Sequence, residues 1–368
     1  MTTLVTGGAG FIGSHLTESL LSSGEEVIIV DDLSTGNERN LAALLEHPSL
    51  RFVKGSILDV PLLDELVSQV QSIYHLAAAV GTFTILDKTL DSLRTNLHGT
   101  ENILDAAVRH RARVLVASTS EVYGKNTKIG LREDDDRIAG STLKNRWSYA
   151  GAKALDETFA YLYWMEHGLE TVMVRLFNTV GPRQSGRYGM VIPRFVAQAL
   201  AGEPLTVYGT GDQVRCFCHV YDVVPALRAL MAEERAQGQV FNLGSSDQIS
   251  ITGLAERVIA VVGSSSTITY VPYESAYGAG FEDMERRVPD CTRARQLIGF
   301  RPSRTLVDII EAVAEDQLTN SAEVSVMSGG KGATDPESAL RSRARVLSAE
   351  PADHPASIRW AGASQLES

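Results

Sequence analysis

A glycine-rich loop near the start of the chain restricts its fold more than any other feature. The segment Gly7-Gly8-Ala9-Gly10-Phe11-Ile12-Gly13 directly follows an apolar strand pattern at Leu4–Thr6, and a helical pattern begins within it. Its spaced glycines allow a tight turn, close approach of a ligand to the backbone, and packing of the helix against the strand. The free N–H groups at the start of such a helix bind phosphate oxygens. The loop therefore predicts a dinucleotide site that includes Gly7, Gly10, Phe11, Ile12 and Gly13.

A carboxylate stands at the end of the second strand pattern, which runs from Glu26 to Val30. At that position Asp31 is able to accept hydrogen bonds from both hydroxyls of an adenosine ribose. Asp32 follows directly and is either a second cofactor contact or a solvated turn residue. Because no arginine stands beside the two acids to neutralise a 2′-phosphate, the sequence favours NAD over NADP as the cofactor.

Short apolar runs alternate with amphipathic helical stretches through the first half of the chain. The runs predict strands at Leu4–Thr6, Glu26–Val30, Arg51–Val53, Ile73–Leu76, Val114–Ala117 and Thr171–Val174. This alternation is typical of a parallel sheet covered by helices on both faces. The predicted fold class is therefore α/β, a Rossmann-type doubly wound parallel sheet with a smaller C-terminal substrate-binding lobe.

The alternation loosens after Gly181-Pro182-Arg183, which predicts a change of domain. We expect an NAD-binding domain at residues 1–180 and a substrate-binding lobe at 181–318, with parts of 217–245 rejoining the first domain. Within the lobe, the pattern predicts a helix at Val191–Ala201 and a strand at Pro204–Tyr208. Residues 319–368 are rich in Ser, Ala, Gly and mixed charge, so we expect a disordered tail there.

Composition excludes several classes of protein. The formal net charge of −11, from 34 basic and 45 acidic residues, opposes non-specific attachment to nucleic acid. No apolar run approaches the length of about 18 residues that a membrane span needs. The first residues contain no basic segment followed by a cleavable apolar stretch, so we expect a cytoplasmic protein without a membrane partner.

The three cysteines, Cys216, Cys218 and Cys291, are predicted to be free thiols because their number is odd. Cys216 and Cys218 alternate within the strand-like segment Arg215–Val220, which favours core packing over metal ligation. We therefore predict no metal.

A tyrosine and a lysine share one face of a predicted helix in Tyr149-Ala150-Gly151-Ala152-Lys153. The ammonium of Lys153 is expected to lower the pKa of the Tyr149 phenol and to hold the nicotinamide ribose. Tyrosinate then takes a hydroxyl proton during hydride transfer. The spacing alone is also common in a surface tyrosine beside a solvated lysine, so the surrounding sequence has to decide.

That surrounding sequence includes Thr119, Ser120 and Glu121, which follow the strand pattern at Val114–Ala117. Open α/β sheets bind their ligands at the carboxyl ends of the strands. Thr119 is placed there to hydrogen-bond a reacting oxygen, and Glu121 to take or return a proton on a substrate ring. The alternative for Glu121 is an ordinary turn or helix-capping acid.

These motifs together resemble the extended short-chain dehydrogenases over about residues 1 to 318. The resemblance rests on the glycine loop, His75-Leu76-Ala77-Ala78, Asn96-Leu97-His98-Gly99-Thr100, Thr119-Ser120-Glu121, and Tyr149 with Lys153. In that family the Tyr/Lys pair and a Ser or Thr reversibly oxidise the C4 hydroxyl of a nucleotide sugar, and the enzyme keeps its NAD. The resemblance implies these roles for Tyr149, Lys153 and Thr119. It also implies that Leu76, Ala77 and Ala78 contact the cofactor.

The same resemblance implies a set of substrate-binding residues. Within Arg175–Arg183, Asn178 matches an asparagine that binds the substrate diphosphate, and Leu205–Gly209 resembles the strand that lines the base pocket. Arg215 and Arg287 match arginines that contact phosphate or sugar, although a lone arginine is often only a solvated charge. The expected substrate contacts are Asn178, Val191, Tyr208, Arg215 and Arg287.

Two further segments resemble one branch of the family, the UDP-glucuronate decarboxylases. They are Asn145-Arg146-Trp147-Ser148-Tyr149 and Glu285-Arg286-Arg287-Val288-Pro289. The resemblance implies C4 oxidation of UDP-glucuronate, loss of CO2 and release of a UDP-4-keto-pentose or UDP-xylose, with Ser120, Glu121 and Arg287 assisting.

Three alternatives stay open at this point. A nucleotide-sugar 4,6-dehydratase acting on GDP-mannose or a similar substrate would use Glu121 to abstract the C5 proton. A UDP-sugar 4-epimerase would not need Glu121, and an NAD-sensing regulator would not need Tyr149. The resemblance also implies a homodimer formed by helices around Thr95–His110 and Ser148–Trp164.

Overall fold

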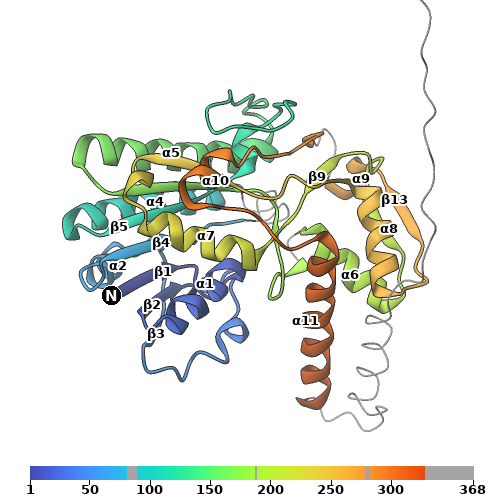
Figure 1. Ribbon diagram of the computed structural model, residues 1–368, viewed down its shortest axis with the longest axis horizontal. Coiled ribbons are helices and arrows are strands. Elements are labelled where there is room, and N and C mark those ends of the chain that lie inside the picture. The colour runs from blue at the N-terminus through green and yellow to red at the C-terminus, as the bar shows by residue number, and fades with distance from the viewer. Residues whose placement is uncertain (81–88, 187–188, 278–281, 328–368) are drawn as a thin grey trace, which may run out of the picture.

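The computed structural model describes residues 1–80, 89–186, 189–277 and 282–327 (Figure 1). Its centre is a seven-stranded parallel sheet with the order β11-β6-β5-β4-β1-β2-β3. The strands are β1 (Thr2–Thr6), β2 (Glu26–Asp31), β3 (Leu50–Lys54), β4 (Ser72–His75), β5 (Arg113–Thr119), β6 (Thr171–Leu176) and β11 (Gln239–Leu243). The chain first winds outward from β1 to β3 and then from β4 to β11 on the other side. The predicted doubly wound fold is confirmed.

Helices cover both faces of this sheet. One face carries α1 (Phe11–Ser22), α7 (Val220–Ala232) and α10 (Thr292–Ile298), and the other carries α2 (Val60–Val67), α4 (Thr89–His110) and α5 (Ser148–His167). Successive side chains of a strand point to opposite faces, so Val5 and Ile29 pack under α1 whereas Leu4 and Ile28 pack under α2 and α4. This burial on both faces explains why the strands read as continuous apolar runs.

A second group of elements packs around its own apolar core beside the sheet (Figure 1). Its helices are α6 (Val191–Ala201), α8 (Ile251–Val262), α9 (Tyr273–Tyr277) and α11 (Leu306–Met327). Its short strands are β8 (Leu205–Tyr208), β9 (Val214–Cys216), β12 (Gln248–Ser250) and β13 (Ile268–Val271), while β7 (Thr179–Val180) pairs with β10 (Cys218–His219) nearer the sheet. Phe195, Leu205, Leu254 and Ile310 are fully buried in this core. We refer to this group as the lobe.

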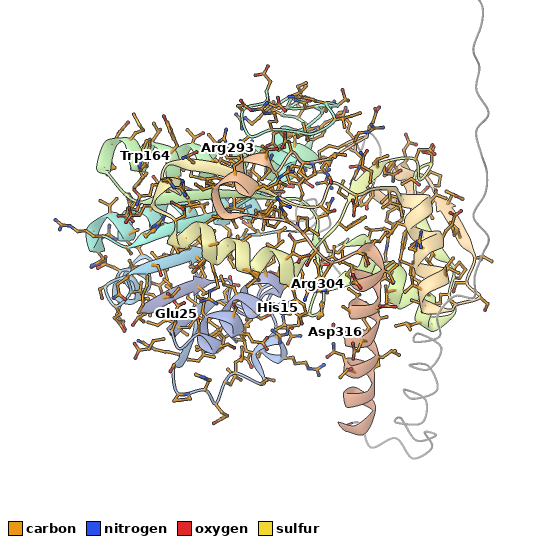
Figure 2. All side chains as sticks on the ribbon, viewed as in Figure 1. His15, Glu25, Trp164, Arg293, Arg304 and Asp316 are labelled. Carbon is orange, nitrogen blue, oxygen red and sulfur yellow. The ribbon has the colours of Figure 1, made fainter. Side chains whose placement is uncertain are left out.

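The chain passes between sheet and lobe several times. After β6 it enters the lobe through α6, returns through α7 and β11, leaves again for α8, and comes back once more at α10. Polar contacts join the two parts: His15 Nε2 of α1 lies 3.0 Å from the Pro182 carbonyl, and Asp316 of α11 accepts from the Arg183 amide at 3.1 Å (Figure 2). Helices α1 and α11 are therefore both held to the loop that contains Pro182 and Arg183.

Short 3-10 helices complete the described elements, at Glu38–Leu41, Ser120–Tyr123, Asn145–Trp147 and Glu234–Ala236. The helix expected at Val191–Ala201 has those bounds as α6. The expectation of disorder from residue 319 is wrong for its first part, because α11 continues to Met327. Adding residues to a helix that is already formed costs far less than starting one, so the polar sequence after residue 319 remains helical. Residues 328–368 lie outside the described residues.

Candidate active site

A cavity of about 1530 Å³ follows the carboxyl ends of the sheet strands and continues into the lobe. Its walls contain the glycine loop and the ends of β2, β4 and β5 on one side, and α6, β8 and β9 on the other. With the exception of Lys153, every residue that the sequence nominated for cofactor, catalysis or substrate lines this cavity. One continuous space therefore joins the three groups of residues.

The glycine loop has no room for side chains at two of its turns. Gly7 has a φ of +70°, and a Cβ there would lie 2.8 Å from the Ala77 amide nitrogen. A Cβ on Gly13 would lie 2.2 Å from the Gly7 carbonyl oxygen. Helix α1 begins directly after Gly10, which has no side chain to cap it. The loop thus presents bare backbone and a free helix N-terminus to the cavity, which is the surface that a pyrophosphate requires.

Asp31 is held in place by backbone amides at the end of β2. Its carboxylate accepts from the Ala9 amide at 2.9 Å and from the Leu33 amide at 2.8 Å. Burial raises the pKa of Asp31, although these two hydrogen bonds oppose the shift. Asp32 instead accepts from the Ser34 amide at 2.9 Å, as an ordinary turn residue does. The oriented carboxylate of Asp31 fits the ribose of an adenosine and disfavours a 2′-phosphate.

Leu76, Ala77 and Ala78 follow β4 and line the cavity beside the glycine loop. Ala77 is fixed by a hydrogen bond from its amide to Thr6 Oγ1 at 3.1 Å. Thr6 Oγ1 also lies 2.8 Å from His75 Nδ1 inside the sheet. This segment therefore closes the cofactor end of the cavity with a rigid backbone.

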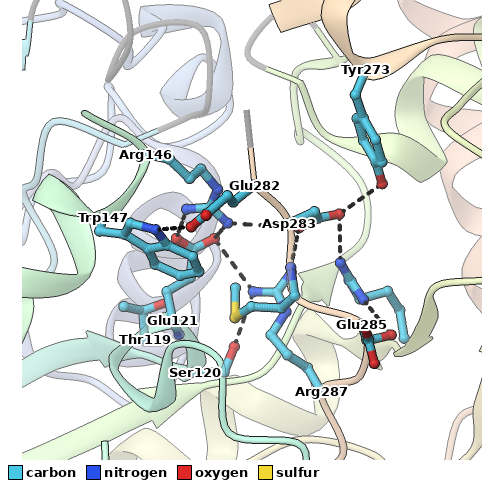
Figure 3. A network of polar contacts seen from close by, with 12 residues as sticks. Thr119, Ser120, Glu121, Arg146, Trp147, Tyr273, Glu282, Asp283, Glu285 and Arg287 are labelled. Carbon is cyan, nitrogen blue, oxygen red and sulfur yellow. Dashed lines mark hydrogen bonds and ion pairs between the residues drawn. The ribbon is translucent and has the colours of Figure 1, made fainter. Parts of the chain in front are cut away.

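Thr119, Ser120 and Glu121 emerge at the end of β5 and form the start of a 3-10 helix. Thr119 Oγ1 accepts from the Glu121 amide at 3.2 Å, which caps that helix. Glu121 lies between two arginines (Figure 3). Arg146 donates to its two oxygens at 2.6 and 3.1 Å, and Arg287 donates to one of them at 3.4 Å.

The charges around Glu121 offset its burial. Burial by itself would raise the pKa of this carboxyl, but the guanidinium groups of Arg146 and Arg287 outweigh that effect and lower it. Burial, together with the nearby charge of Arg215, lowers the pKa of Arg287 to about 10. At neutral pH the site therefore pairs an ionised carboxylate with two protonated arginines.

Tyr149 lines the cavity, whereas Lys153 one turn later is buried behind it. The Lys153 ammonium donates to Asp156 Oδ2 at 2.7 Å, and both side chains are almost completely inaccessible. The pKa of Tyr149 is raised by burial, with further contributions from Glu121 and Asp156. We expected Lys153 to lower the pKa of Tyr149, but the pKa is raised when no ligand is bound. Lys153 does not lower it because its ammonium is paired with Asp156.

The predicted substrate contacts gather at the other end of the cavity. Asn178 adopts a φ of +34° and donates to the Cys216 carbonyl at 2.7 Å. Val191 stands at the start of α6 and Tyr208 at the end of β8. Arg215 is already engaged, because it donates to Asp283 at 2.9 Å and to the Val214 carbonyl at 2.9 Å. A diphosphate contact from Arg215 would compete with Asp283.

Sequence reasoning assigned no role to several residues that the fold brings into this cavity. The most consequential is Arg146, which belongs to the motif Asn145–Tyr149 but whose partner Glu121 lies on another element. Asp283 lies shortly before the motif Glu285–Pro289 and also accepts from the Tyr273 hydroxyl at 3.1 Å. In the sequence, the one indication that these charged residues belong to the site is that they lie within or beside the motifs. Further polar residues that line the cavity, and that the sequence did not predict for the site, include Arg39, Gln184, Arg194, Gln213 and Tyr277.

Some other kinds of site are not found in the described part of the chain. No group of three or more His, Cys, Asp or Glu side chains there is arranged to hold a metal ion. Cys216 and Cys218 are buried in β9 and β10, and all three cysteines are free. Within the same residues, no helix has the length and apolar character of a membrane span.

Comparisons with known proteins agree with this geometry. A model of the NAD-dependent epimerase/dehydratase family matches residues 3–244. A UDP-N-acetyl-alpha-D-glucosaminuronate decarboxylase from Bacillus cytotoxicus is 44% identical over 301 residues, which cover 82% of this chain and 92% of that protein. UDP-glucuronic acid decarboxylase 1 from Xenopus tropicalis is 36% identical over 299 residues, with coverage of 81% and 68%.

A solved structure of UDP-glucuronic acid 4-epimerase from Bacillus cereus, in complex with UDP-glucuronic acid and NAD, superposes with a TM-score of 0.78. It is 28% identical and covers 86% of this chain and 98% of its own. These matches span both the sheet and the lobe, and they confirm the resemblance that the sequence motifs indicated. The chain therefore belongs to the NAD-dependent epimerase/dehydratase family.

Proposed function

We propose that the chain is an NAD-dependent decarboxylase of a UDP-linked hexuronic acid, with UDP-glucuronate as the favoured substrate. The observation that carries this proposal is the position of the Glu121 carboxylate between Arg146 and Arg287, in the cavity that also holds Thr119 and Tyr149. Two relatives at 44% and 36% identity are named as decarboxylases of UDP-linked uronic acids. An arginine beside the reacting ring suits a substrate that carries a carboxylate.

The cofactor end of the cavity fits NAD. The bare backbone of Gly7, Gly10 and Gly13 would contact the pyrophosphate, Asp31 the adenosine ribose, and Leu76, Ala77 and Ala78 the remaining surface. Phe11 and Ile12 open α1 beside them, with Asp32 at the rim. When bound, NAD+ supplies the acceptor for the hydride that leaves C4 of the sugar.

The first step assigned to this chain is proton removal from the C4 hydroxyl. Tyr149 takes that proton and Thr119 hydrogen-bonds the same oxygen. The raised pKa of Tyr149 in the chain alone means that the bound cofactor or a redirected Lys153 must favour its ionised form. The result is a ketone at C4, adjacent to the carbon that carries the carboxylate.

Loss of CO2 follows from the chemistry of a β-keto acid. The bond from C5 to the carboxylate breaks and releases CO2, its electron pair moves into the C4 ketone as an enolate, and C5 then takes a proton that water supplies. Arg287 is placed to orient the carboxylate, while Ser120 and Glu121 assist the proton transfer. The ketone is then either released or reduced to the pentose.

The nucleotide part of the substrate is assigned to the lobe side of the cavity. Asn178 and Arg215 would contact the diphosphate, with Val191 and Tyr208 beside the base. Arg194 lies in the same wall, its guanidinium carbon 4.1 Å from the centre of the Tyr208 ring. Cationic side chains at this end match the negative charge of a diphosphate.

Assembly, location and domain limits are part of the same proposal. We assign a homodimer to α4 and α5, and this is supported by exposed apolar side chains on α5, namely Leu155, Leu162 and Met165. We assign the protein to the cytoplasm. The proposed division is an NAD-binding part at 1–180 joined by segments of 217–245, and a nucleotide-sugar part at 181–318.

The test is to incubate purified protein with NAD+ and, separately, UDP-glucuronate, UDP-N-acetylglucosaminuronate, UDP-glucose, dTDP-glucose and GDP-mannose, and to follow products by mass spectrometry. Loss of CO2 from either uronic acid supports the proposal and identifies the substituent accepted at C2. Loss of water from a neutral hexose, or an unchanged mass with inverted C4, would overturn it in favour of a dehydratase or an epimerase. NAD binding without any turnover would favour a sensor.

A further inference from the structure

Glu121 is held much more tightly by one of its two arginines than by the other. Arg146 makes a two-pronged contact, with Nη1 at 2.6 Å from Oε2 and Nη2 at 3.1 Å from Oε1. The exposed fractions of the two side chains are 8% and 17%. A planar guanidinium that meets both oxygens of a buried carboxylate fixes its orientation as well as its charge.

Arg287 approaches the same carboxylate more loosely. Its Nη1 is 3.4 Å from Glu121 Oε1 and also 3.4 Å from Ser120 Oγ, so one nitrogen is shared between two distant acceptors (Figure 3). A shared contact at that distance is weak. Arg287 is therefore free to exchange Glu121 for another carboxylate without leaving its place.

Arg146 has packing contacts that do not involve the side chain of Arg287. It belongs to the 3-10 turn directly before α5, and its guanidinium carbon lies 5.4 Å from the centre of the Trp147 ring. Trp147 Nε1 donates to Glu282 at 2.9 Å, and Glu282 also pairs with Lys125 and Lys144. Rotation of the Arg287 side chain alone breaks none of these contacts.

We propose that Arg146 is a positioning residue, which fixes the carboxylate of Glu121 so that Arg287 can release it and bind the carboxylate of the substrate. The inference rests on the proposed decarboxylase function. It separates two arginines that occupy the same network: Arg146 acts through Glu121, and Arg287 acts on the substrate.

The charged and titratable groups that face Glu121 come from three elements. Arg146 and Tyr149 approach from the turn before α5 and from its start, and Arg287 and Asp283 approach from the segment after residue 281. Of these, the arginines favour the ionised carboxylate, while Asp283 and burial oppose it. Removal of Arg146 takes away the hydrogen-bonded fork and one of the two positive charges that lower the pKa of Glu121.

The experiment compares wild type with Arg146→Gln and Arg146→Lys through the pH dependence of kcat/KM for CO2 release. If activity needs ionised Glu121, it falls as pH drops through the pKa of that group. In Arg146→Gln this acidic limb should move to higher pH by about one unit or more. At a pH on the acidic limb of wild type, kcat/KM of the variant would then be about tenfold lower than that of wild type. Arg146→Lys retains the charge, so its acidic limb should lie close to that of wild type. An unchanged limb in Arg146→Gln, whatever its rate, would overturn the proposal.

A second measurement needs no substrate and so separates this inference from the proposed function. The carboxyl group of Glu121 is titrated by infrared difference spectroscopy, with Glu121→Gln used to assign its band. The pKa should rise in Arg146→Gln, and an unchanged value would contradict the positioning role. Wild-type protein that shows the expected titration but releases no CO2 would refute the decarboxylase alone.

Arg175 provides a matched control. It makes an equally buried fork with Glu157, at 2.7 and 2.9 Å, but neither residue lines the cavity. Arg175→Gln should therefore lower the melting temperature without moving the acidic limb or the Glu121 band. A shift of the limb in this variant as well would show that general loosening of the fold, and not the fork on Glu121, moves the titration.

Discussion

Within α5, the helix that carries Tyr149, the buried carboxylate of Asp156 balances the positive charge of Lys153. Tyr149, Lys153 and Asp156 recur at intervals of about one helical turn, so the carboxylate lies on the same side of α5 as the phenol. The lysine is thereby kept in the protein interior at little net charge. In this pairing the ammonium donates to Asp156.

Replacement of the phenol tests whether the chain performs chemistry. Tyr149→Phe should lower kcat by about 10²- to 10⁴-fold, because the hydroxyl proton of the substrate loses its acceptor. NAD affinity should persist, since the glycine loop is untouched. Product formation by mass spectrometry and NAD titration by calorimetry measure the two effects. Tyr270→Phe, which alters a half-exposed tyrosine outside the cavity, serves as the control and should retain full activity.

Removal of the counter-charge should destabilise the fold. Asp156→Asn leaves the Lys153 ammonium buried without a carboxylate, and breaking such a pair costs about 3–5 kcal/mol. Urea unfolding measures the loss. The double variant Lys153→Met with Asp156→Asn should recover part of it, whereas Glu65→Gln, which breaks an exposed pair with Arg51, should cost less than about 1 kcal/mol. Equal effects of Asp156→Asn and Glu65→Gln would contradict this account.

The sequence predicted the residues of the site that sit within local motifs, and it left out those that depend on distant partners. The glycine loop nominated Gly7, and the end of the second strand pattern nominated Asp31, because the backbone at both positions is set by neighbouring residues. Arg146 and Asp283 lie within or beside family motifs, yet their roles arise from contacts between segments far apart in the chain. No local pattern specifies which carboxylate an arginine will meet.

Among the elements, the long helix α11 shows how capping of the first turn allows the residues after it to be helical. Thr305 Oγ1 accepts from the Asp308 amide at 3.2 Å, and Asp308 Oδ2 accepts from the Thr305 amide at 2.6 Å. These reciprocal bonds satisfy amides that the first turn of a helix leaves unpaired. Ile309 and Ile310 then bury the helix against the lobe. The composition after residue 319 by itself indicates disorder. It does not reveal that these residues continue a helix that began at Leu306.

Loss of this capping should weaken the lobe by a modest amount. Thr305→Ala removes the hydroxyl that accepts from Asp308 and should lower the free energy of unfolding by about 1 kcal/mol. Thr305→Ser retains the hydroxyl and should stay within a few tenths of a kcal/mol of wild type. Thermal unfolding followed by circular dichroism compares the two. A Thr305→Ser variant as unstable as Thr305→Ala would assign the effect to the lost methyl group instead.

At the scale of the whole molecule, buried histidines link stability to pH. Burial, with a further contribution from Lys153, lowers the pKa of His75 to about 3, and burial lowers that of His219 to about 4. Both side chains are inaccessible in the fold but gain protons near pH 6.5 when the chain unfolds. The unfolded state therefore binds more protons between those values, and folding is penalised there.

The free energy of unfolding should accordingly fall as pH is lowered from about 6.5 toward the folded-state values. Each such histidine contributes a slope of at most about 1.4 kcal/mol per pH unit. Urea unfolding at several pH values measures the slope. His75→Asn keeps polar atoms near Thr6 and Thr100 but does not titrate, so its slope should be smaller by up to that amount. An identical slope in wild type and His75→Asn would assign the acid sensitivity to other groups.

The position of β11 at the edge of the sheet has a consequence for how the protein is made. Because β11 pairs with β6, the seventh strand reaches the ribosome exit only after residues 177 to 238 have been synthesised. Until then β6 is an open strand edge, of the kind that attracts other chains. Synthesis proceeds at about 5–20 residues per second, so each nascent chain spends seconds in that state. Chaperone dependence during translation should therefore be greatest between the emergence of β6 and that of β11.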